Sequence, residues 1–150
     1  MKPAVPDEID NRILALLAQN GRASYTELGE AAGLSAHAAA DRVRRLQQAG
    51  VITGFTATID PSRVGRGLDA LVDVRLQPNA DPDRFESVVA DLEAVREVAF
   101  VTGRSDYHLR INCRDADALN QTIRTLRQRA GAAVTETRIV MRSERFRRGS

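Results

Sequence analysis

Three short stretches of helical periodicity fill the first fifty residues, and each of them ends at a glycine, which limits how this part of the chain can fold. Acidic residues open the first stretch near Asp7. Ser24 and Glu27 have the spacing of a capping box at the start of the second, and Ser35 is placed to cap the third. Two helices joined by a tight turn that contains Gly33 match the helix-turn-helix layout. The sequence therefore predicts a three-helix unit of that kind.

The third predicted helix, residues 35–49, has two contrasting faces. Ala39, Val43 and Leu46 share one face and are expected to pack on the first two helices. Small residues near the start of the other face allow the backbone to approach base edges, and arginines further along reach phosphates. We therefore predict a DNA recognition helix. Its candidate DNA-binding residues are Ser35, Ala36, His37, Ala40, Asp41, Arg42, Arg44 and Arg45.

Three of these candidates have a second interpretation. Arg42 lies on the flank of the helix and equally suits a structural ion pair, with Asp10 as the candidate partner. His37 suits a base contact and ordinary exposed surface about equally. Asp41 would repel phosphates, so it either accepts a hydrogen bond from a cytosine amino group or restrains an arginine.

The residues after Gly50 are rich in β-branched side chains. This composition predicts a strand over residues 51–60, serving as the hairpin wing of a winged helix-turn-helix or as a linker.

The second half of the chain alternates between strand-like and helix-like patterns. Apolar and polar residues alternate over 68–77, and Pro78 to Pro82 breaks that strand. A helix capped by Asp81 or Asp83 follows, then strands over 95–102 and 107–113, a helix that begins at Asp115 or Asp117, and a last strand over 134–141. This βαββαβ order predicts an α+β, ferredoxin-like domain with two helices on one face of an antiparallel sheet.

A series of motifs in this chain resembles the Lrp/AsnC family of bacterial and archaeal regulators. In the first half they are Asp10-x-x-Ile13-Leu14, Gly21-Arg22, Glu27-Leu28, Gly33-Leu34-Ser35, Arg42-Val43-x-Arg45-Leu46, Gly50-Val51-Ile52, Asp60-Pro61 and Gly65. In the second half they are Val101-Thr102-Gly103-x-x-Asp106-Tyr107 and Thr137-x-Ile139-Val140-Met141, which resemble the family's regulator-of-amino-acid-metabolism domain. The resemblance spans roughly residues 7 to 145.

The resemblance implies an organisation and a set of partners. We expect a helix-turn-helix DNA-binding domain at 1–52, a strand or linker at 53–67, an effector-binding and oligomerisation domain at 68–145, and a basic tail at 146–150. The expected function is that of a transcriptional regulator that binds double-stranded DNA as a homodimer, assembles to an octamer and responds to an amino acid or related metabolite. Its target would be a degenerate palindrome.

The glycine-containing turn between the second and third strands is the expected effector pocket. The residues assigned to it are Thr102, Gly103, Arg104, Ser105, Asp106 and, less directly, Thr137. Gly103 is equally explained by turn geometry, and Asp106 by a hydrogen bond to local backbone. Tyr107 and Cys113 are expected in the core.

Composition argues against several other classes of protein. A single cysteine excludes an internal disulfide and multi-cysteine metal sites, and the two histidines fall in different predicted domains. No glycine-rich phosphate loop is present, so we expect no enzyme and no cofactor. No apolar run is long enough to cross a membrane, which favours the cytoplasm. The alternatives are a ligand-independent architectural DNA binder and an enzyme similar to the siroheme decarboxylases, with His108 and nearby arginines holding a tetrapyrrole.

Overall fold

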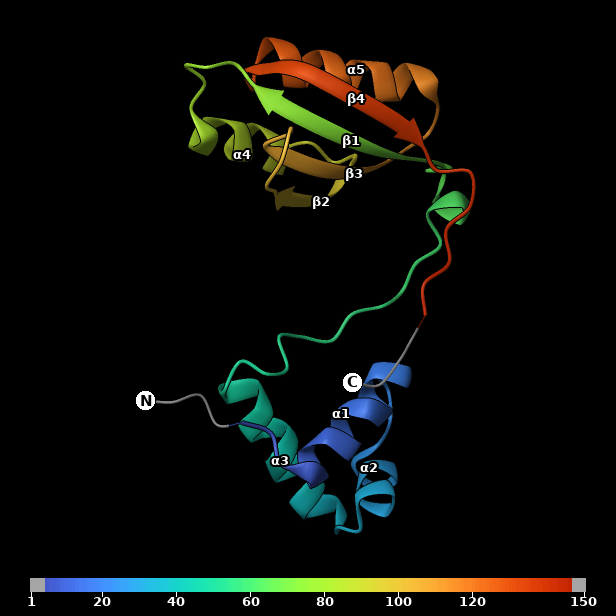
Figure 1. The fold of residues 1–150 in the computed structure, drawn as a ribbon. Coiled ribbons are helices and arrows are strands. Elements are labelled where there is room, and N and C mark those ends of the chain that lie inside the picture. The colour runs from blue at the N-terminus through green and yellow to red at the C-terminus, as the bar shows by residue number, and fades with distance from the viewer. Residues whose placement is uncertain (1–4, 147–150) are drawn as a thin grey trace. The chain divides into compact units, whose positions relative to one another are not determined.

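The computed structural model describes residues 5–146, which fall into two compact units (Figure 1). One unit holds the described residues up to Thr58 together with 144–146, and the other holds Ile59–Ser143. The predicted basic tail, 146–150, lies outside the described residues except for Phe146. Within the described part of the chain, no helix has the length and apolar character needed to cross a membrane.

The first unit is made of three helices, whose predicted starts are confirmed. They are α1 (Glu8–Gln19), α2 (Tyr25–Ala32) and α3 (Ala36–Gln48). Capping boxes at Asp7 and Ser24 begin the first two helices. In each box, the side chain of the cap residue accepts a hydrogen bond from the backbone N–H three residues later, and the side chain of that later residue accepts one from the backbone N–H of the cap residue. Ser35 caps α3 by accepting from the backbone N–H of Ala38 at 3.1 Å.

A small apolar core holds these helices together. Ile13, Leu28, Ala32, Ala39 and Val43 are buried and packed on one another. Gly33 follows α2 with φ of 72°, a left-handed conformation that favours glycine and that lets the chain turn sharply into α3. The predicted helix-turn-helix is thus confirmed.

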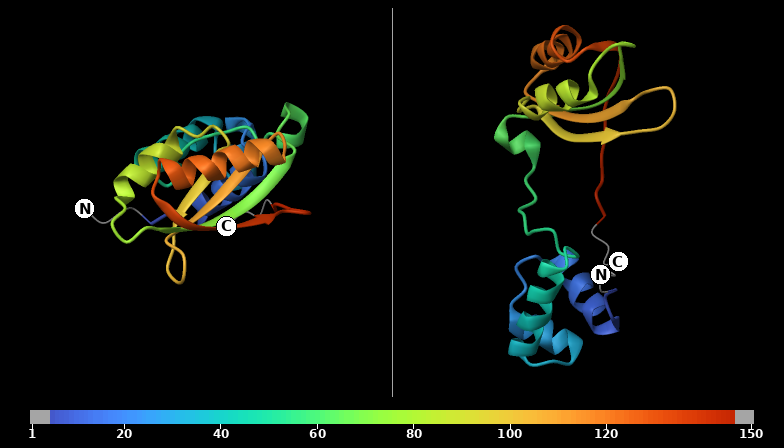
Figure 2. Two further views of the ribbon diagram at one scale, coloured as in Figure 1. Left: turned by 90° about the horizontal axis from the view of Figure 1, so that it is seen from above. Right: turned by 90° about the vertical axis from the view of Figure 1, so that its left-hand side faces the viewer.

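The second unit has the predicted βαββαβ order. Its elements are a short 3₁₀ turn η1 (Pro61–Val64), β1 (Leu68–Leu76), α4 (Pro82–Ala90), β2 (Val95–Phe100), β3 (Tyr107–Cys113), α5 (Ala116–Gln128) and β4 (Ala132–Ile139). The antiparallel sheet has the order β2-β3-β1-β4. Both helices cover one face of it (Figure 2), so the α+β, ferredoxin-like prediction is confirmed.

The core of this unit lies between the helices and the covered face of the sheet. Val72, Val74, Leu109 and Ile111 from the two central strands are fully buried. The rings of Phe85 and Tyr107 stack with centroids 4.4 Å apart. Tyr107 and Cys113 both lie in this core, as predicted.

The largest departure from the sequence-based prediction is at residues 51–60. The described chain has no strand there and no hairpin wing; residues 53–60 carry no regular structure. A strand requires a neighbouring strand to satisfy its backbone groups, and this segment has no such neighbour in its own described chain. β-branched residues suit a strand but do not create one.

Candidate DNA interface and effector loop

The outer face of α3 is open to solvent along its length. Ser35, Ala36, His37 and Asp41 are exposed, as are Arg44 and Arg45 further along, whereas Ala40 is half-buried. The inner residues Ala39, Val43 and Leu46 are at most 5% exposed. The helix therefore presents small side chains at its start and guanidiniums later, which suits base edges followed by phosphates.

Asp41 restrains its basic neighbours on that face. Its Oδ1 lies 2.6 Å from Arg44 Nη2, and its Oδ2 lies 3.4 Å from His37 Nε2. Of the two interpretations of Asp41, the structure shows the restraint of an arginine. Arg45 makes no ion pair or hydrogen bond through its side chain within the described residues.

Arg42 points away from this open face. Its Nη1 lies 2.7 Å from Asp7 Oδ2 and 2.9 Å from Asp10 Oδ1, and its side chain is only 19% exposed. Hydrogen bonding to the two carboxylates raises the pKa of Arg42, and the hydrogen bond from Arg42 lowers the pKa of Asp7. The structure thus shows the structural ion pair of Arg42, while a DNA contact by this residue stays a prediction.

The turn between β2 and β3 brings five of the six effector candidates together. Gly103 has φ of 111°, which side-chain-bearing residues rarely adopt, so the turn requires glycine here. Thr102, Gly103 and Arg104 are exposed, and Ser105 and Asp106 are half-buried.

Asp106 anchors this turn to the end of β1. Its Oδ2 accepts from the backbone N–H of Leu76 at 2.8 Å, and its own N–H donates to the carbonyl of Val74 at 2.9 Å. The carboxylate thus bonds to the backbone of β1, 30 positions away in the sequence, and not to the local backbone of its own turn. Its other oxygen keeps free lone pairs.

Thr137 does not join the other candidates within one chain. It pairs with Val72, which pairs on its other side with Leu109, so two strand spacings, about 10 Å, separate it from β3. A pocket that contained both Thr137 and the turn would have to use a second copy of the chain.

The sheet face that the helices leave open carries an ion-pair network that the sequence analysis did not identify. Asp69 accepts from Arg110 Nη2 at 2.6 Å and from Asn112 Nδ2 at 3.0 Å. Asp73 lies 2.7 Å from His108 Nδ1 and accepts from Arg138 Nη2 at 2.8 Å. The alternation of acidic residues in β1 and basic residues in β3 was visible, but only the register shows which of them pair.

Among the described residues, no group of three or more His, Cys, Asp or Glu side chains could hold a metal ion.

Comparison with known proteins gives the same two units. The AsnC-type helix-turn-helix domain matches residues 7–47, and the Lrp/AsnC ligand binding domain matches residues 69–149. Curated relatives include the leucine-responsive regulatory protein of Klebsiella pneumoniae, 37% identical over 139 residues, which are 90% of this chain and 84% of that protein. The HTH-type transcriptional regulator AldR of Mycolicibacterium smegmatis is 36% identical over 138 residues, covering 89% of this chain and 80% of the relative.

Solved structures agree over nearly the whole chain. A transcriptional regulator from Neisseria meningitidis in complex with L-Met superposes with a TM-score of 0.89 at 27% identity, covering 95% of this chain and 94% of that one. A feast or famine regulatory protein from Mycobacterium tuberculosis, complexed with L-methionine, gives 0.86 at 34% identity and covers 91% and 92%. With both domain families matched in order and relatives above 30% identity along most of its length, the chain belongs to the Lrp/AsnC family of DNA-binding transcriptional regulators.

Proposed function

We propose that this regulator recognises its operator through α3 and responds to an amino acid at the turn between β2 and β3. The observation that supports the first half is the contrast between the faces of α3: one is buried on α1 and α2, while the other exposes Ala36, His37, Arg44 and Arg45. The side chains at the start of the helix would meet base edges, and the two arginines would contact phosphates.

The acting unit is a homodimer that assembles further to an octamer. Within the described chain, both outer strands have free edges, and apolar side chains remain exposed on them: Val98 and Phe100 on β2, and Val134 and Ile139 on β4. Association between copies would cover these edges and the open sheet face. Two α3 helices related by a two-fold axis would enter successive major grooves, so the operator should be a degenerate palindrome.

The effector is expected to be an amino acid or related metabolite held by Thr102, Gly103, Arg104, Ser105 and Asp106 of one copy, with Thr137 supplied by another. Two solved relatives hold L-methionine, which makes this amino acid the first probe. The free oxygen of Asp106 is a natural partner for an ammonium group. Binding between copies would change the assembly and the spacing of the DNA-binding helices, while leaving the base contacts themselves unchanged.

DNA binding is tested by fluorescence anisotropy over a range of salt concentrations, with a promoter of the neighbouring operon and a shuffled duplex. We expect Arg44→Ala and Arg45→Ala to weaken binding and to reduce the salt slope by about 1 for each phosphate that is no longer neutralised. Arg124→Ala, at an arginine of the second unit, is the matched control and should leave binding unchanged. Equal affinity of the wild-type protein for both duplexes would contradict sequence-specific regulation.

Effector binding is tested by calorimetry with L-methionine and the other proteinogenic amino acids. Asp106→Asn retains an oxygen that can accept from the Leu76 N–H while losing the negative charge, so it should fold and bind an ammonium-bearing effector less tightly. No heat with any amino acid would favour the architectural DNA binder. Unaltered binding by Asp106→Asn would place the effector elsewhere.

A further inference from the structure

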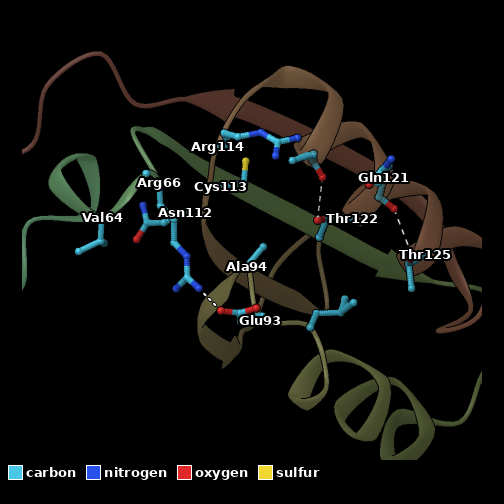
Figure 3. Close-up of a pocket in the computed structure, with 13 residues that line it drawn as sticks. Val64, Arg66, Glu93, Ala94, Asn112, Cys113, Arg114, Gln121, Thr122 and Thr125 are labelled. Atoms are coloured by element: carbon cyan, nitrogen blue, oxygen red, sulfur yellow. Dashed lines mark hydrogen bonds and ion pairs between the residues drawn. The ribbon is translucent and has the colours of Figure 1, made fainter.

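A cavity of about 480 Å³ opens at the end of β3 that lies away from the Gly103 turn (Figure 3). Four separate segments line it: the end of η1 with the residues after it, the loop between α4 and β2, the end of β3 with the residue after it, and one side of α5. β3 runs from Tyr107 to Cys113, so about 20 Å of strand separates the cavity from the turn. Its volume falls within the range of small-molecule sites.

Opposite charges line one wall of this cavity. Arg66 forms an ion pair with Glu93, and Figure 3 shows the pair bridging two of the lining segments. The side chain of Arg66 is 28% exposed, whereas that of Glu93 is 83% exposed. A guanidinium has five N–H donors, so Arg66 retains donors for a ligand carboxylate after pairing with Glu93. Glu93, held in place by Arg66, is available to an ammonium group.

The rest of the lining mixes polar groups, among them Asn112, Gln121 and Arg114, which pairs with Asp115, with small apolar side chains. Cys113, only 4% exposed, and the half-buried Leu92, Ala94 and Ala118 offer apolar surface. The hydroxyl of Thr122 donates to the carbonyl of Ala118 within α5. The combination of an oriented cation, a nearby carboxylate and short apolar side chains fits a ligand that carries a carboxylate beside a small apolar group.

We propose that this cavity is a second small-molecule site, separate from the Gly103 turn, for an α-amino acid or the corresponding 2-oxo acid with a short apolar side chain. Arg66 binds the carboxylate that both ligand types share, and Glu93 favours the amino acid because the oxo acid has no ammonium group. The inference does not depend on DNA binding or on the turn, so it can fail while the proposed function stands.

Cys113 provides a direct readout, because it is the only cysteine in the sequence and lines the cavity. Burial raises the pKa of its thiol, so alkylation by iodoacetamide should be slow and easily timed. A ligand at ten times its Kd leaves about one site in eleven free, so alkylation should slow about elevenfold and in a saturable manner. The probes are L-alanine, L-valine, L-leucine and L-methionine, and the 2-oxo acids pyruvate and 2-oxoisovalerate.

Four variants of the full chain locate the ligand. Arg66→Ala should raise the half-protecting concentration about tenfold for both ligand types, whereas the matched control Arg63→Ala, at an 87% exposed arginine outside the cavity, should not. Glu93→Gln, at an exposed residue that leaves the core untouched, should weaken protection by amino acids alone. Asp106→Asn should leave protection unchanged.

Three outcomes would overturn the proposal. They are a lack of saturable protection with every probe, equal effects of Arg66→Ala and Arg63→Ala, and loss of protection in Asp106→Asn, which would assign the effect to the turn. If Arg66→Ala does not fold, Glu93→Gln tests the proposed site in its place. Unchanged protection by amino acids in Glu93→Gln would also contradict the proposal.

Discussion

Arg42 and Arg44 lie two positions apart in α3, yet their guanidiniums have different surroundings. Arg44 is on the open face and pairs only with Asp41 on the same helix, among the described residues. Arg42 reaches across to Asp7 and Asp10 at the start of α1 and joins the two helices. A helical step of about 100° per residue turns neighbouring side chains in different directions, so one arginine serves the fold while the other is available to DNA.

Arg42→Ala should lower the melting temperature of the helix-turn-helix unit, because it leaves the carboxylates of Asp7 and Asp10 without their cation. The pKa of Asp7 is lowered from its usual 3.8, so its contribution is present above about pH 4 and is lost as the pH falls through the lower pKa of the folded state. The difference between variant and wild type in thermal melts should therefore shrink between about pH 7 and pH 3. Arg12→Ala, at an exposed arginine on α1, is the control; a difference that did not change with pH would contradict this explanation.

In the second unit, we expect stability to depend on pH in the opposite direction, because of Tyr107. Burial and a 2.7 Å hydrogen bond to Glu86 raise its pKa from 10.0 to about 12. The unfolded state loses the phenol proton first, so stability should fall by roughly 2 kcal/mol between about pH 10 and pH 12. Tyr107→Phe should remove this alkaline loss and cost about 1 kcal/mol at neutral pH. Urea unfolding at several pH values measures both effects, and Tyr25→Phe, at an exposed tyrosine, should retain the alkaline loss.

At the scale of elements, the approach of α2 to the start of α3 depends on Gly29. A β-carbon there would lie 2.5 Å from the carbonyl oxygen of Leu34 and 3.1 Å from the carbonyl of Ser35, both of them backbone atoms that cannot rotate away. The turn that positions the recognition helix is therefore set by the absence of a side chain on α2.

Gly29→Ala should destabilise the first unit by about 1 to 3 kcal/mol, despite the better helix propensity of alanine, because α2 and α3 must move apart. The same shift should weaken DNA binding. Gly21→Ala is the matched control, since its β-carbon would meet the nearest atom, Leu17 O, at 4.0 Å. Thermal melts and anisotropy of both variants test this, and equal behaviour of the two would contradict it.

Most elements of both units were predictable from local sequence, for identifiable reasons. Capping side chains such as Ser24 and Ser35 act on backbone groups about three residues away, so their effect is contained in the sequence around them. Alternation in β1 and β3 reflects one buried and one open sheet face. The prediction of a strand over residues 51–60 is wrong. A strand forms only beside a partner strand, and the sequence of the segment does not encode that partner.

At the scale of the whole molecule, the segment 53–60 contains the boundary between the two units, at Thr58 and Ile59, and has no regular structure of its own. Phe55 in this segment is 52% exposed and has no β-ladder to protect it. Chymotrypsin should cut the native protein first after Phe55, because proteases require extended, accessible backbone. Mass spectrometry of a time course identifies the site.

The C-terminal product of that cut should keep the oligomeric state of the uncut protein in size-exclusion chromatography with light scattering, because the proposed association surfaces belong to the sheet. The N-terminal product should elute as a monomer. First cleavage within a helix or strand of either unit would contradict the accessibility of segment 53–60, and a monomeric C-terminal product would contradict the proposed dimer.

The sequence by itself determined the helices, most of the strands, their order and the family, because caps, glycine stops and hydrophobic periodicity act over a few residues. Only the tertiary structure decided which charged groups meet: Arg42 with Asp7, Arg110 with Asp69, and Asp106 with the end of β1. It also showed the cavity beside Cys113, whose walls come from four distant segments. Such pairings depend on helix docking and strand register, which emerge only when the whole chain has packed.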